Sequence, residues 1–248
     1  MRHISVAKQF DNGLNVTERA ASVMRMFGVD KQRLRDNRKI HKCDLDIADG
    51  DIVYITGPSG AGKSVLLREI QNQIPPAERI SIDDIPLPAE KSVIDCVTEP
   101  VSAQRSADSG LNKLNAERCS LSLIEAMRLL GYAGLSDVFC MLTAPANLSE
   151  GQKYRFRLAC CLAAGKAAIF ADEFCSNLDR ITAGVIAYNV RRFTKKAGVT
   201  FFLASSHEDI LADLQPDVLV VKRFMGPAEV SYKNIKNKNA KSKNIEEE

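Results

Sequence analysis

Apolar residues gather along the chain in short, nearly continuous runs that are bounded by glycines or polar residues. Four of these runs, at 51–56, 167–171, 200–204 and 218–221, have the length of buried strands. The stretches between them include apolar residues at the three- and four-residue spacing of helices. Strands that alternate with helices predict an α/β fold with a mainly parallel core sheet.

The N-terminal part of the chain predicts a helix and an antiparallel β element. Thr17 precedes an amphipathic run that ends at Gly28, so we expect a capped helix at about 17–27. Its Met and Phe side chains are expected in the core. Apolar and polar residues alternate from 39 to 47, and a turn at 48–51 follows, which is typical of a hairpin that enters a sheet.

A helical region interrupts this α/β pattern. Apolar residues recur at helical spacing from 121 to 130, and Gly131 is expected to close that helix. We therefore place an inserted α-helical subdomain at about 92–150, within a single domain that spans 1–230. The segment 231–248 is basic and has too few apolar side chains to fold alone, so we expect a disordered tail.

The composition is that of an ordinary globular protein, with 45% hydrophobic and 26% charged residues. No apolar run approaches the roughly 18 to 20 residues that cross a bilayer, and the first residues lack the apolar core of a secretion signal. We therefore expect a cytoplasmic chain without a membrane span of its own. The seven cysteines are scattered and form no C-x-x-C pair, which favours reduced core thiols over disulfides or a zinc site.

The net charge of +3 comes from the end of the chain, because acidic and basic residues balance before residue 222. Such a balance does not indicate a broad nucleic-acid surface. Two local basic stretches remain, at 31–42 and 233–243. We interpret both as solvated surface, and binding of nucleic acid through them is the alternative.

One segment predicts a phosphate-binding loop, because it fills every fixed position of the pattern G-x-x-x-x-G-K-[ST] and lies between a strand and a helix. Backbone N–H groups and the helix N-terminus would cradle a phosphate chain. The ammonium of Lys63 would reach the outer phosphates, and the hydroxyl of Ser64 would ligate Mg²⁺. The expected nucleotide-binding residues are Gly57, Pro58, Ser59, Gly60, Ala61, Gly62, Lys63, Ser64 and Val65.

A second candidate site follows the apolar run that ends at Ala171. Asp172 and Glu173 come directly after it, at the end of a parallel strand where α/β sheets place ligands. Asp172 is suited to hold Mg²⁺, and Glu173 is suited to orient and polarise an attacking water. An apolar strand that ends in two acids is also common without any function, so the phosphate loop is needed to make this interpretation specific.

Three further segments make the pattern more specific. The sequence Leu148-Ser-Glu-Gly-Gln152 runs into a helical segment, Ser176-Asn-Leu-Asp179 follows Glu173, and His207 comes after the strand at 200–204. Together with the phosphate loop and the acidic pair, they resemble the signature motif, the D-loop and the switch histidine of the ABC ATPase superfamily. The resemblance covers about residues 38–222.

This resemblance implies an enzyme that binds ATP with Mg²⁺ and hydrolyses it to ADP and phosphate. It also implies a head-to-tail homodimer, in which Ser149, Gly151 and Gln152 of one subunit cap the ATP held by the phosphate loop of the other. Glu173 would orient the water and His207 would sense the γ-phosphate. The expected catalytic residues are Glu173, His207 and Lys63, and the expected metal ligands are Ser64 and Asp172.

The chain departs from the family at several positions. The family has a glutamine near the Mg²⁺, but the corresponding stretch 80–88 contains none, so we expect Asp83 or Asp84 to take its place. Glu150 replaces the first glycine of the signature, and Phe174 stands where the family prefers proline. Phe27 is a weak candidate for stacking on adenine, because no aromatic just before the hairpin is a clear one.

Two functions from different classes remain open. We favour a soluble ATPase that clamps a nucleic acid or protein partner, because the glutamine is missing and the N-terminal helix is not a standard transporter feature. In addition, 17–29 and 53–68 resemble ABC-type ATPases joined to a predicted acetyltransferase domain. The alternative is the ATP-binding subunit of a membrane transporter, which would need a separate permease. A scaffold that binds ATP without turnover is a third reading, and the intact catalytic set argues against it.

Overall fold

A six-stranded sheet forms the centre of the computed structural model, which describes residues 1–9, 16–30, 32–33, 40–99, 121–224 and 226–233. The strand order is β4-β5-β6-β3-β7-β8, and all neighbours are parallel except β7 and β8. This confirms the predicted α/β class and the four predicted strands of the parallel sheet. The strands are β3 (Ile52–Thr56), β4 (Arg79–Ser81), β5 (Ala168–Ala171), β6 (Thr200–Ala204), β7 (Val218–Val221) and β8 (Glu229–Tyr232).

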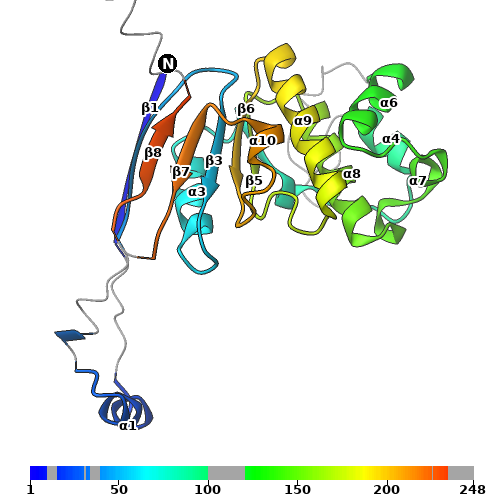
Figure 1. Ribbon diagram of the computed structural model, residues 1–248. Helices are drawn as coiled ribbons and strands as arrows, with labels where there is room; N and C mark the ends of the chain where they lie inside the picture. Colours follow the sequence, from blue (N-terminus) through cyan, green and yellow to red (C-terminus); the bar gives the residue numbers. More distant parts are fainter. Residues whose placement is uncertain (10–15, 31, 34–39, 100–120, 225, 234–248) are drawn as a thin grey trace, which may run out of the picture.

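Helices pack on both faces of this sheet (Figure 1). On one face Val53 and Ile55 of β3 pack against apolar side chains of α3, and on the other Ile52 and Tyr54 share a core with α8 and α9. Burial on both faces explains why β3 is a continuous apolar run in the sequence. The helices are α1 (Glu18–Met26), α3 (Lys63–Asn72), α4 (Val93–Thr98), α6 (Leu123–Tyr132), α7 (Val138–Leu142), α8 (Glu150–Ala163), α9 (Arg180–Ala197) and α10 (Leu211–Leu214), with 3-10 turns η1 (Ile82–Asp84) and η3 (Pro145–Asn147).

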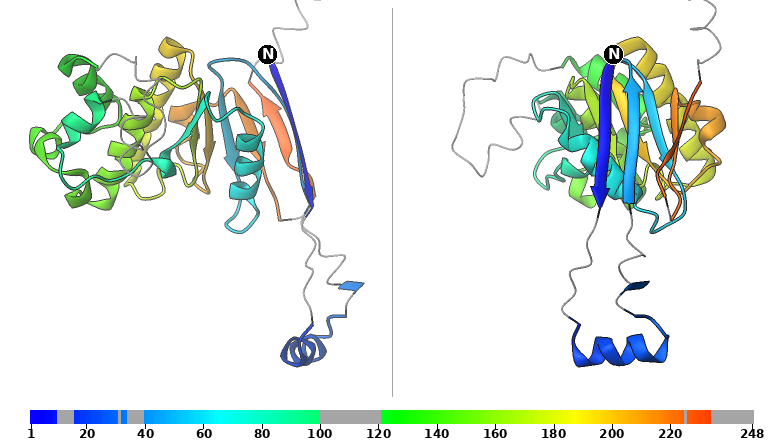
Figure 2. Two further views of the ribbon diagram at one scale, coloured as in Figure 1. Left: turned by 180° about the vertical axis from the view of Figure 1, so that it is seen from behind. Right: turned by 90° about the vertical axis from the view of Figure 1, so that its left-hand side faces the viewer.

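A separate two-stranded antiparallel sheet lies on the α3 side, as Figure 2 shows. It pairs β1 (Arg2–Gln9) with β2 (Ile40–Ile47), and Ile4 faces Leu45 across the pair. Both residues are buried in the core that α3 and the large sheet share. A strand of an antiparallel pair is therefore present at 40–47, but the predicted hairpin is wrong: β2 pairs with the strand at the start of the chain, which was not predicted, whereas β3 pairs with β6 and β7.

The predicted N-terminal helix is present as α1, but the prediction that its Met and Phe side chains lie in the core is wrong. Thr17 caps α1 by accepting a hydrogen bond from the Ala20 N–H (3.3 Å). None of the residues of α1 is buried, and Met26 and Phe27 are 81% and 76% exposed. In Figure 2 the helix lies beyond the ends of β1 and β2, away from both sheets, so the described core offers its apolar face no partner.

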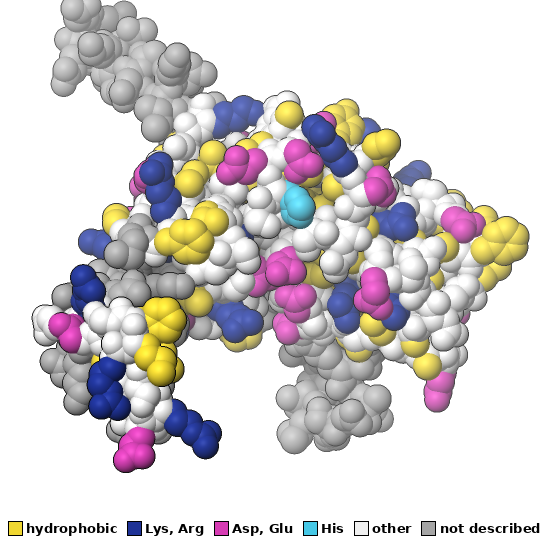
Figure 3. All heavy atoms as spheres, turned by 60° about the horizontal axis from the view of Figure 1, so that its bottom comes forward, with side chains coloured by type: hydrophobic (Ala, Val, Ile, Leu, Met, Phe, Trp, Pro, Cys, Tyr) yellow, Lys and Arg dark blue, Asp and Glu magenta, His cyan; other side chains and the backbone are white. Residues whose placement is uncertain are grey.

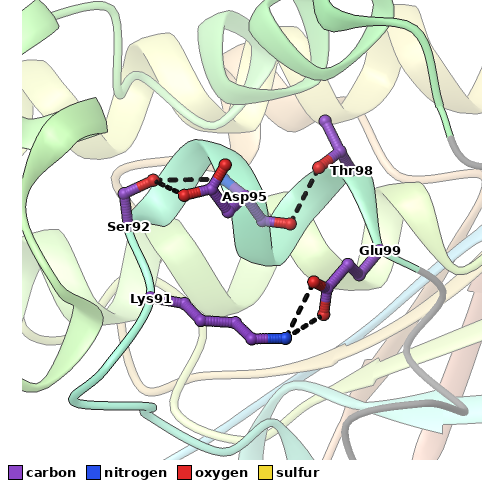
Figure 4. Close-up of polar contacts among 5 residues, drawn as sticks. All are labelled: Lys91, Ser92, Asp95, Thr98 and Glu99. Carbon is purple, nitrogen blue, oxygen red and sulfur yellow. Dashed lines mark hydrogen bonds and ion pairs between the residues drawn. The ribbon is translucent and has the colours of Figure 1, made fainter.

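Short helices form the end of the molecule opposite the β1–β2 sheet (Figure 1). Here α4 contacts α6, α7 and α8. Figure 4 shows how α4 is held at both ends: the Ser92 hydroxyl accepts from the Asp95 N–H (3.3 Å), and the Lys91 ammonium bonds the Glu99 carboxylate (2.7 and 2.8 Å). The Ser92 cap stabilises a helix of only six residues.

The prediction that α6 ends at Gly131 is wrong. Gly131 lies inside the helix, and the chain leaves it at Ala133 and Gly134, where Gly134 has a φ of +77°. Glycine is favoured at such a left-handed position after a helix, so the correct stop signal was the second glycine. Residues 100–120 and most of the 231–248 tail fall outside the described residues, and the domain boundaries stay predictions. Within the described chain, no helix has both the length and the apolar character to cross a membrane.

Candidate functional site

The predicted phosphate loop connects β3 to α3 through three glycines with positive φ. Gly57, Gly60 and Gly62 have φ values of +141°, +78° and +94°, a region that side-chain-bearing residues rarely adopt. Gly57 also has a steric reason, because a Cβ there would lie 2.0 Å from the carbonyl oxygen of Lys222. The loop thus requires glycine both for its conformation and for its close approach to the segment after β7.

Lys63 is the first residue of α3, and its ammonium turns back over the loop. It donates to the carbonyl oxygens of Gly57 (2.8 Å) and Pro58 (3.1 Å). The ammonium therefore lies on the loop whose N–H groups are expected to hold phosphate, next to the positive end of the α3 dipole. Ser64 follows it on the first turn of the helix.

The acidic pair follows β5 in an unusual backbone conformation. Glu173 and Cys175 have φ values of +48° and +60°, although neither is glycine. Several hydrogen bonds hold this segment: the Phe174 N–H donates to the Ala204 carbonyl (2.8 Å), the Cys175 N–H donates to the Tyr154 hydroxyl (3.2 Å), and the Ser176 hydroxyl donates to the Glu173 carbonyl (2.8 Å). Residues in sparsely populated φ/ψ regions are common at active sites, and they persist only where the surroundings fix them.

The departure at Phe174 has a structural explanation. Its side chain is completely buried, and it joins the core that contains α8 and α9. A proline at this position could not donate the hydrogen bond to Ala204. The phenylalanine thus anchors the segment of the acidic pair to both the core and the neighbouring strand β6.

The signature segment forms a capped start of α8. The Ser149 hydroxyl accepts from the Gln152 N–H (3.3 Å), and the Gln152 side chain accepts from the Ser149 N–H (2.9 Å), a reciprocal capping box. The Leu178 side chain lies next to Gly151, and a Cβ added at residue 151 would lie 3.1 Å from it. Glu150, which replaces a glycine, is the first residue of the helix, where a negative charge is favourable, and it pairs with Lys153 (2.8 Å).

A polar cavity of about 230 Å³ lies where the acidic pair, the signature helix and η1 meet. Asp83 lines it together with Asp172 and Glu173, whereas Asp84 does not. Burial raises the pKa of the Asp83 carboxyl, the negative charge of Asp172 raises it further, and the Arg157 guanidinium opposes the shift. Of the two candidates for the missing glutamine, the geometry favours Asp83. The cavity is lined by Ile82, Asp83, Glu150, Tyr154, Arg157, Asp172, Glu173, Ser176 and Asn177.

His207 follows β6 and does not belong to this lining. Its N–H donates to the Ser205 hydroxyl (3.2 Å), and its carbonyl accepts a short hydrogen bond from the buried Tyr54 hydroxyl. Burial raises the pKa of Tyr54 to about 12, so the phenol keeps its proton and stays a donor. Tyr54, which the sequence did not single out, therefore ties the histidine segment to β3, the strand that leads into the phosphate loop.

Tyr154 and Arg157 were also missed. They follow Glu150 by one and two turns of α8, and all three line the cavity. This spacing was visible in the sequence, but nothing there showed that this face of the helix would meet the acidic pair.

The comparisons with known proteins show the family of this chain. The family described as "ABC transporter" matches residues 40–176, which is more than half of the chain, so the protein belongs to that family. It carries an ABC-type ATP-binding domain, a class that hydrolyses ATP with Mg²⁺. Solved structures of this class share the fold: dimeric MJ0796, a bacterial ABC transporter cassette, superposes with a TM-score of 0.58 at 19% identity, covering 78% of this chain and 91% of that chain.

Several curated relatives are similar over most of this chain. An uncharacterized ABC transporter ATP-binding protein (y4fO) of Sinorhizobium fredii is 31% identical over 73% of this chain and 56% of its own length. The methionine import ATP-binding protein MetN of Nocardia farcinica is 28% identical over 81% and 63%. The lipoprotein-releasing system ATP-binding protein LolD of Bordetella pertussis is 27% identical over 68% and 78%. The chain thus spans less than two thirds of the first two relatives.

These relatives favour the transporter alternative over the soluble clamp that the sequence favoured. The resemblance to acetyltransferase-associated ATPases finds no support in them.

Proposed function

We propose that this chain is the ATP-hydrolysing subunit of an ABC membrane transporter. The observation that carries the proposal is the agreement among its relatives, which are named as ATP-binding proteins of methionine import, of sulfoquinovosyl glycerol transport and of lipoprotein release. No helix in the described part of the chain could span a membrane. In the proposed transporter a permease would carry the substrate.

The phosphate loop would hold the triphosphate, with Lys63 on its outer phosphates and Ser64 and Asp172 around Mg²⁺. The metal would neutralise the charge of the phosphates. Glu173 would orient and polarise the attacking water, and its left-handed backbone fixes the direction in which the carboxylate leaves β5. His207 would sense the γ-phosphate from the end of β6.

The two phosphate-binding elements lie on opposite faces of the sheet, which supports a head-to-tail dimer. The apolar residues of α3 belong to one core and those of α8 belong to the other. The phosphate loop starts α3, and Ser149, Gly151 and Gln152 start α8. We propose that each ATP is held by one subunit's loop and closed by the partner's signature segment, so that binding of ATP joins the subunits.

The permease would dock on the helical end of the molecule. Exposed apolar side chains gather there on α6 and α7, and Phe139 and Leu142 are 81% and 67% exposed. Figure 3 shows hydrophobic side chains at the same end. An apolar patch of this kind marks an interaction surface. Its apolar members are Leu123, Ile124, Met127, Val138, Phe139 and Leu142.

Hydrolysis is tested by comparing the purified wild-type protein with Glu173→Gln. We expect Mg²⁺-dependent ATP hydrolysis by the wild type and a loss of at least about 100-fold in the variant, with ATP binding retained, because only the group that orients the water changes. If both proteins are equally inactive while they bind ATP, the scaffold reading is correct instead.

The transporter role is tested by affinity purification from native membranes. We expect a membrane protein with several spans to accompany the wild type, to be lost with Phe139→Ser/Leu142→Ser, and to stay with Ile181→Ser, a matched change at a residue that is 81% exposed on α9. Recovery of the chain with nucleic acid in a salt-sensitive manner, without a membrane protein, would favour the soluble clamp.

A further inference from the structure

The signature segment, residues 148–152, is bound to the end of another helix by an arginine of α8. The Arg155 guanidinium donates from Nε to the carbonyl of Gly151 (3.1 Å) and from Nη1 to the carbonyl of Gly134 (2.9 Å). Gly151 belongs to the signature segment, and Gly134 lies where the chain leaves α6. One half-buried side chain therefore joins the signature segment to the end of α6.

An arginine suits this bridge, because its guanidinium presents several N–H donors in one fixed plane. The two bonded carbonyl groups are therefore held at a defined separation. Packing supports the bridge, since a Cβ added at Gly134 would lie 3.5 Å from Cδ of Arg155. α6 and α8 also pack against each other at the helical end of the molecule (Figure 1). The bridge thus belongs to a packed contact between two helices.

A second contact binds the signature segment to α7. The Gln152 side chain uses its oxygen in the capping box with Ser149, and its Nε2 donates to the Sγ of Cys140 (3.0 Å). Cys140 is held in turn, because its thiol donates to the Asp137 carboxylate at the start of α7 (3.3 Å). Both helices that carry the exposed apolar patch, α6 and α7, are thus linked to the start of α8 by hydrogen bonds.

We propose that Arg155 is a positioning residue for the signature segment: its guanidinium fixes Gly151 relative to the end of α6, so that this segment meets the ATP of the partner subunit in a defined orientation. The inference rests on the proposed head-to-tail dimer. It adds a residue that lies outside the five signature positions. Because α6 carries part of the exposed apolar patch, the same bridge connects the proposed permease surface with the segment that closes the ATP site.

The experiment measures ATP-driven dimerisation in a Glu173→Gln background, in which the proposed mechanism retains bound ATP. Arg155→Gln is the main variant, because its amide nitrogen can take the place of Nε beside Gly151 but is too short to reach the Gly134 carbonyl. Analytical ultracentrifugation gives the dissociation constant of the dimer with ATP and Mg²⁺, and a fluorescent ATP analogue measures nucleotide binding by the dilute monomer. We expect the dissociation constant to rise about 10-fold, and binding of the analogue to change less than about twofold.

Two further variants separate positioning from general stability. In Arg155→Lys a charged donor can still reach the Gly134 carbonyl, but without the planar fork, so we expect the dissociation constant to rise only about threefold. Asn189→Ala is the matched control. It removes another bond to the end of α6, from the Asn189 amide to the Tyr132 carbonyl (3.1 Å), which does not involve the signature segment. This variant should dimerise like the Glu173→Gln background.

Four results would overturn the proposal. They are an unchanged dissociation constant in Arg155→Gln, an equal loss of analogue binding by its monomer, an Arg155→Lys variant no better than Arg155→Gln, and an equal effect of Asn189→Ala. Thermal melting identifies a variant that does not fold. If Arg155→Gln is one, Arg155→Lys decides between the expected rise and an unchanged constant. Absence of ATP-driven dimers in the Glu173→Gln protein itself would contradict the proposed dimer, and with it the role of Arg155.

Discussion

Both turns of the candidate site, the phosphate loop and the turn after β5, place the backbone at positive φ, and they do so with different residues. In the phosphate loop the residues are Gly57, Gly60 and Gly62, which adopt such angles at little cost. After β5 they are Glu173 and Cys175, for which a left-handed conformation costs about 1–2 kcal/mol each. In the proposed mechanism the loop needs bare backbone against phosphate, whereas the turn after β5 needs a carboxylate. Where a side chain is required, packing and hydrogen bonds must stabilise a strained backbone conformation that glycine would adopt without strain.

The largest loss of stability is expected from Phe174→Pro, which removes contacts that hold the strained turn after β5. The change removes a fully buried ring and the N–H that donates to Ala204 (2.8 Å). Loss of a buried Phe side chain alone costs about 3–5 kcal/mol, so the variant should be unfolded or nearly so at 25 °C. Urea denaturation measures the loss. Phe174→Leu keeps the N–H and most of the volume and should lose about 1.5 kcal/mol or less; equal losses in the two variants would show that the hydrogen bond contributes nothing.

Gly57→Ala tests the phosphate loop. Its Cβ would lie 2.0 Å from the Lys222 carbonyl oxygen. Because this oxygen belongs to the backbone, the clash can be relieved only if β7 or the loop moves. We expect a loss of about 3 kcal/mol or more and loss of nucleotide binding. Gly60→Ala is the matched control, because Gly60 also has positive φ but a Cβ there meets only the edge of Phe224 at 3.9 Å. It should lose about 1–2 kcal/mol, and a Gly57→Ala variant as stable as that control would contradict the steric argument.

Tyr154→Phe tests the hydrogen bonds of the strained turn without changing its packing. The variant leaves the Cys175 N–H buried without an acceptor, which costs about 1–3 kcal/mol. Because the bond fixes the segment that carries Glu173, we also expect kcat to fall while ATP binding is kept. Tyr188→Phe is the control, since this side chain is 53% exposed on α9. Equal melting temperatures of the two variants would show that Tyr154 does not support the turn.

The difference between the two turns also explains what the sequence could predict. Glycine spacing is a local signal, so the phosphate loop and its strand and helix could be predicted residue by residue. The strands β3, β5 and β6 were predictable because burial on both faces makes them continuous apolar runs. β7 is also a continuous apolar run, although every second residue of it is only partly buried. β4 is only three residues long and β8 is half-exposed at the sheet edge, so neither left a clear pattern.

Tertiary contacts account for what remained hidden. The positive φ of Glu173 and the contacts of Tyr154 and Arg157 depend on how α8 meets the end of β5, which no local pattern encodes. The error at α1 has a related cause. An amphipathic pattern shows that a helix has an apolar face, but it does not show that the partner of that face is in the same chain.

The smallest effect on stability is expected from Gln215→Gly, which tests whether positive φ is a strain outside the proposed active site. Gln215 ends α10 with a φ of +43°, and it has the strained backbone of Glu173 without a catalytic role in the proposed mechanism. Glycine should relieve the strain and stabilise the protein by about 0.5–1 kcal/mol, a gain reduced by losing the exposed hydrogen bond from Lys233 (2.9 Å). ATP hydrolysis should not change. If the variant is less stable than the wild type, positive φ outside the active site is not a strain that glycine can relieve. The strain at Glu173 would then need another explanation than the requirement for a carboxylate at that turn.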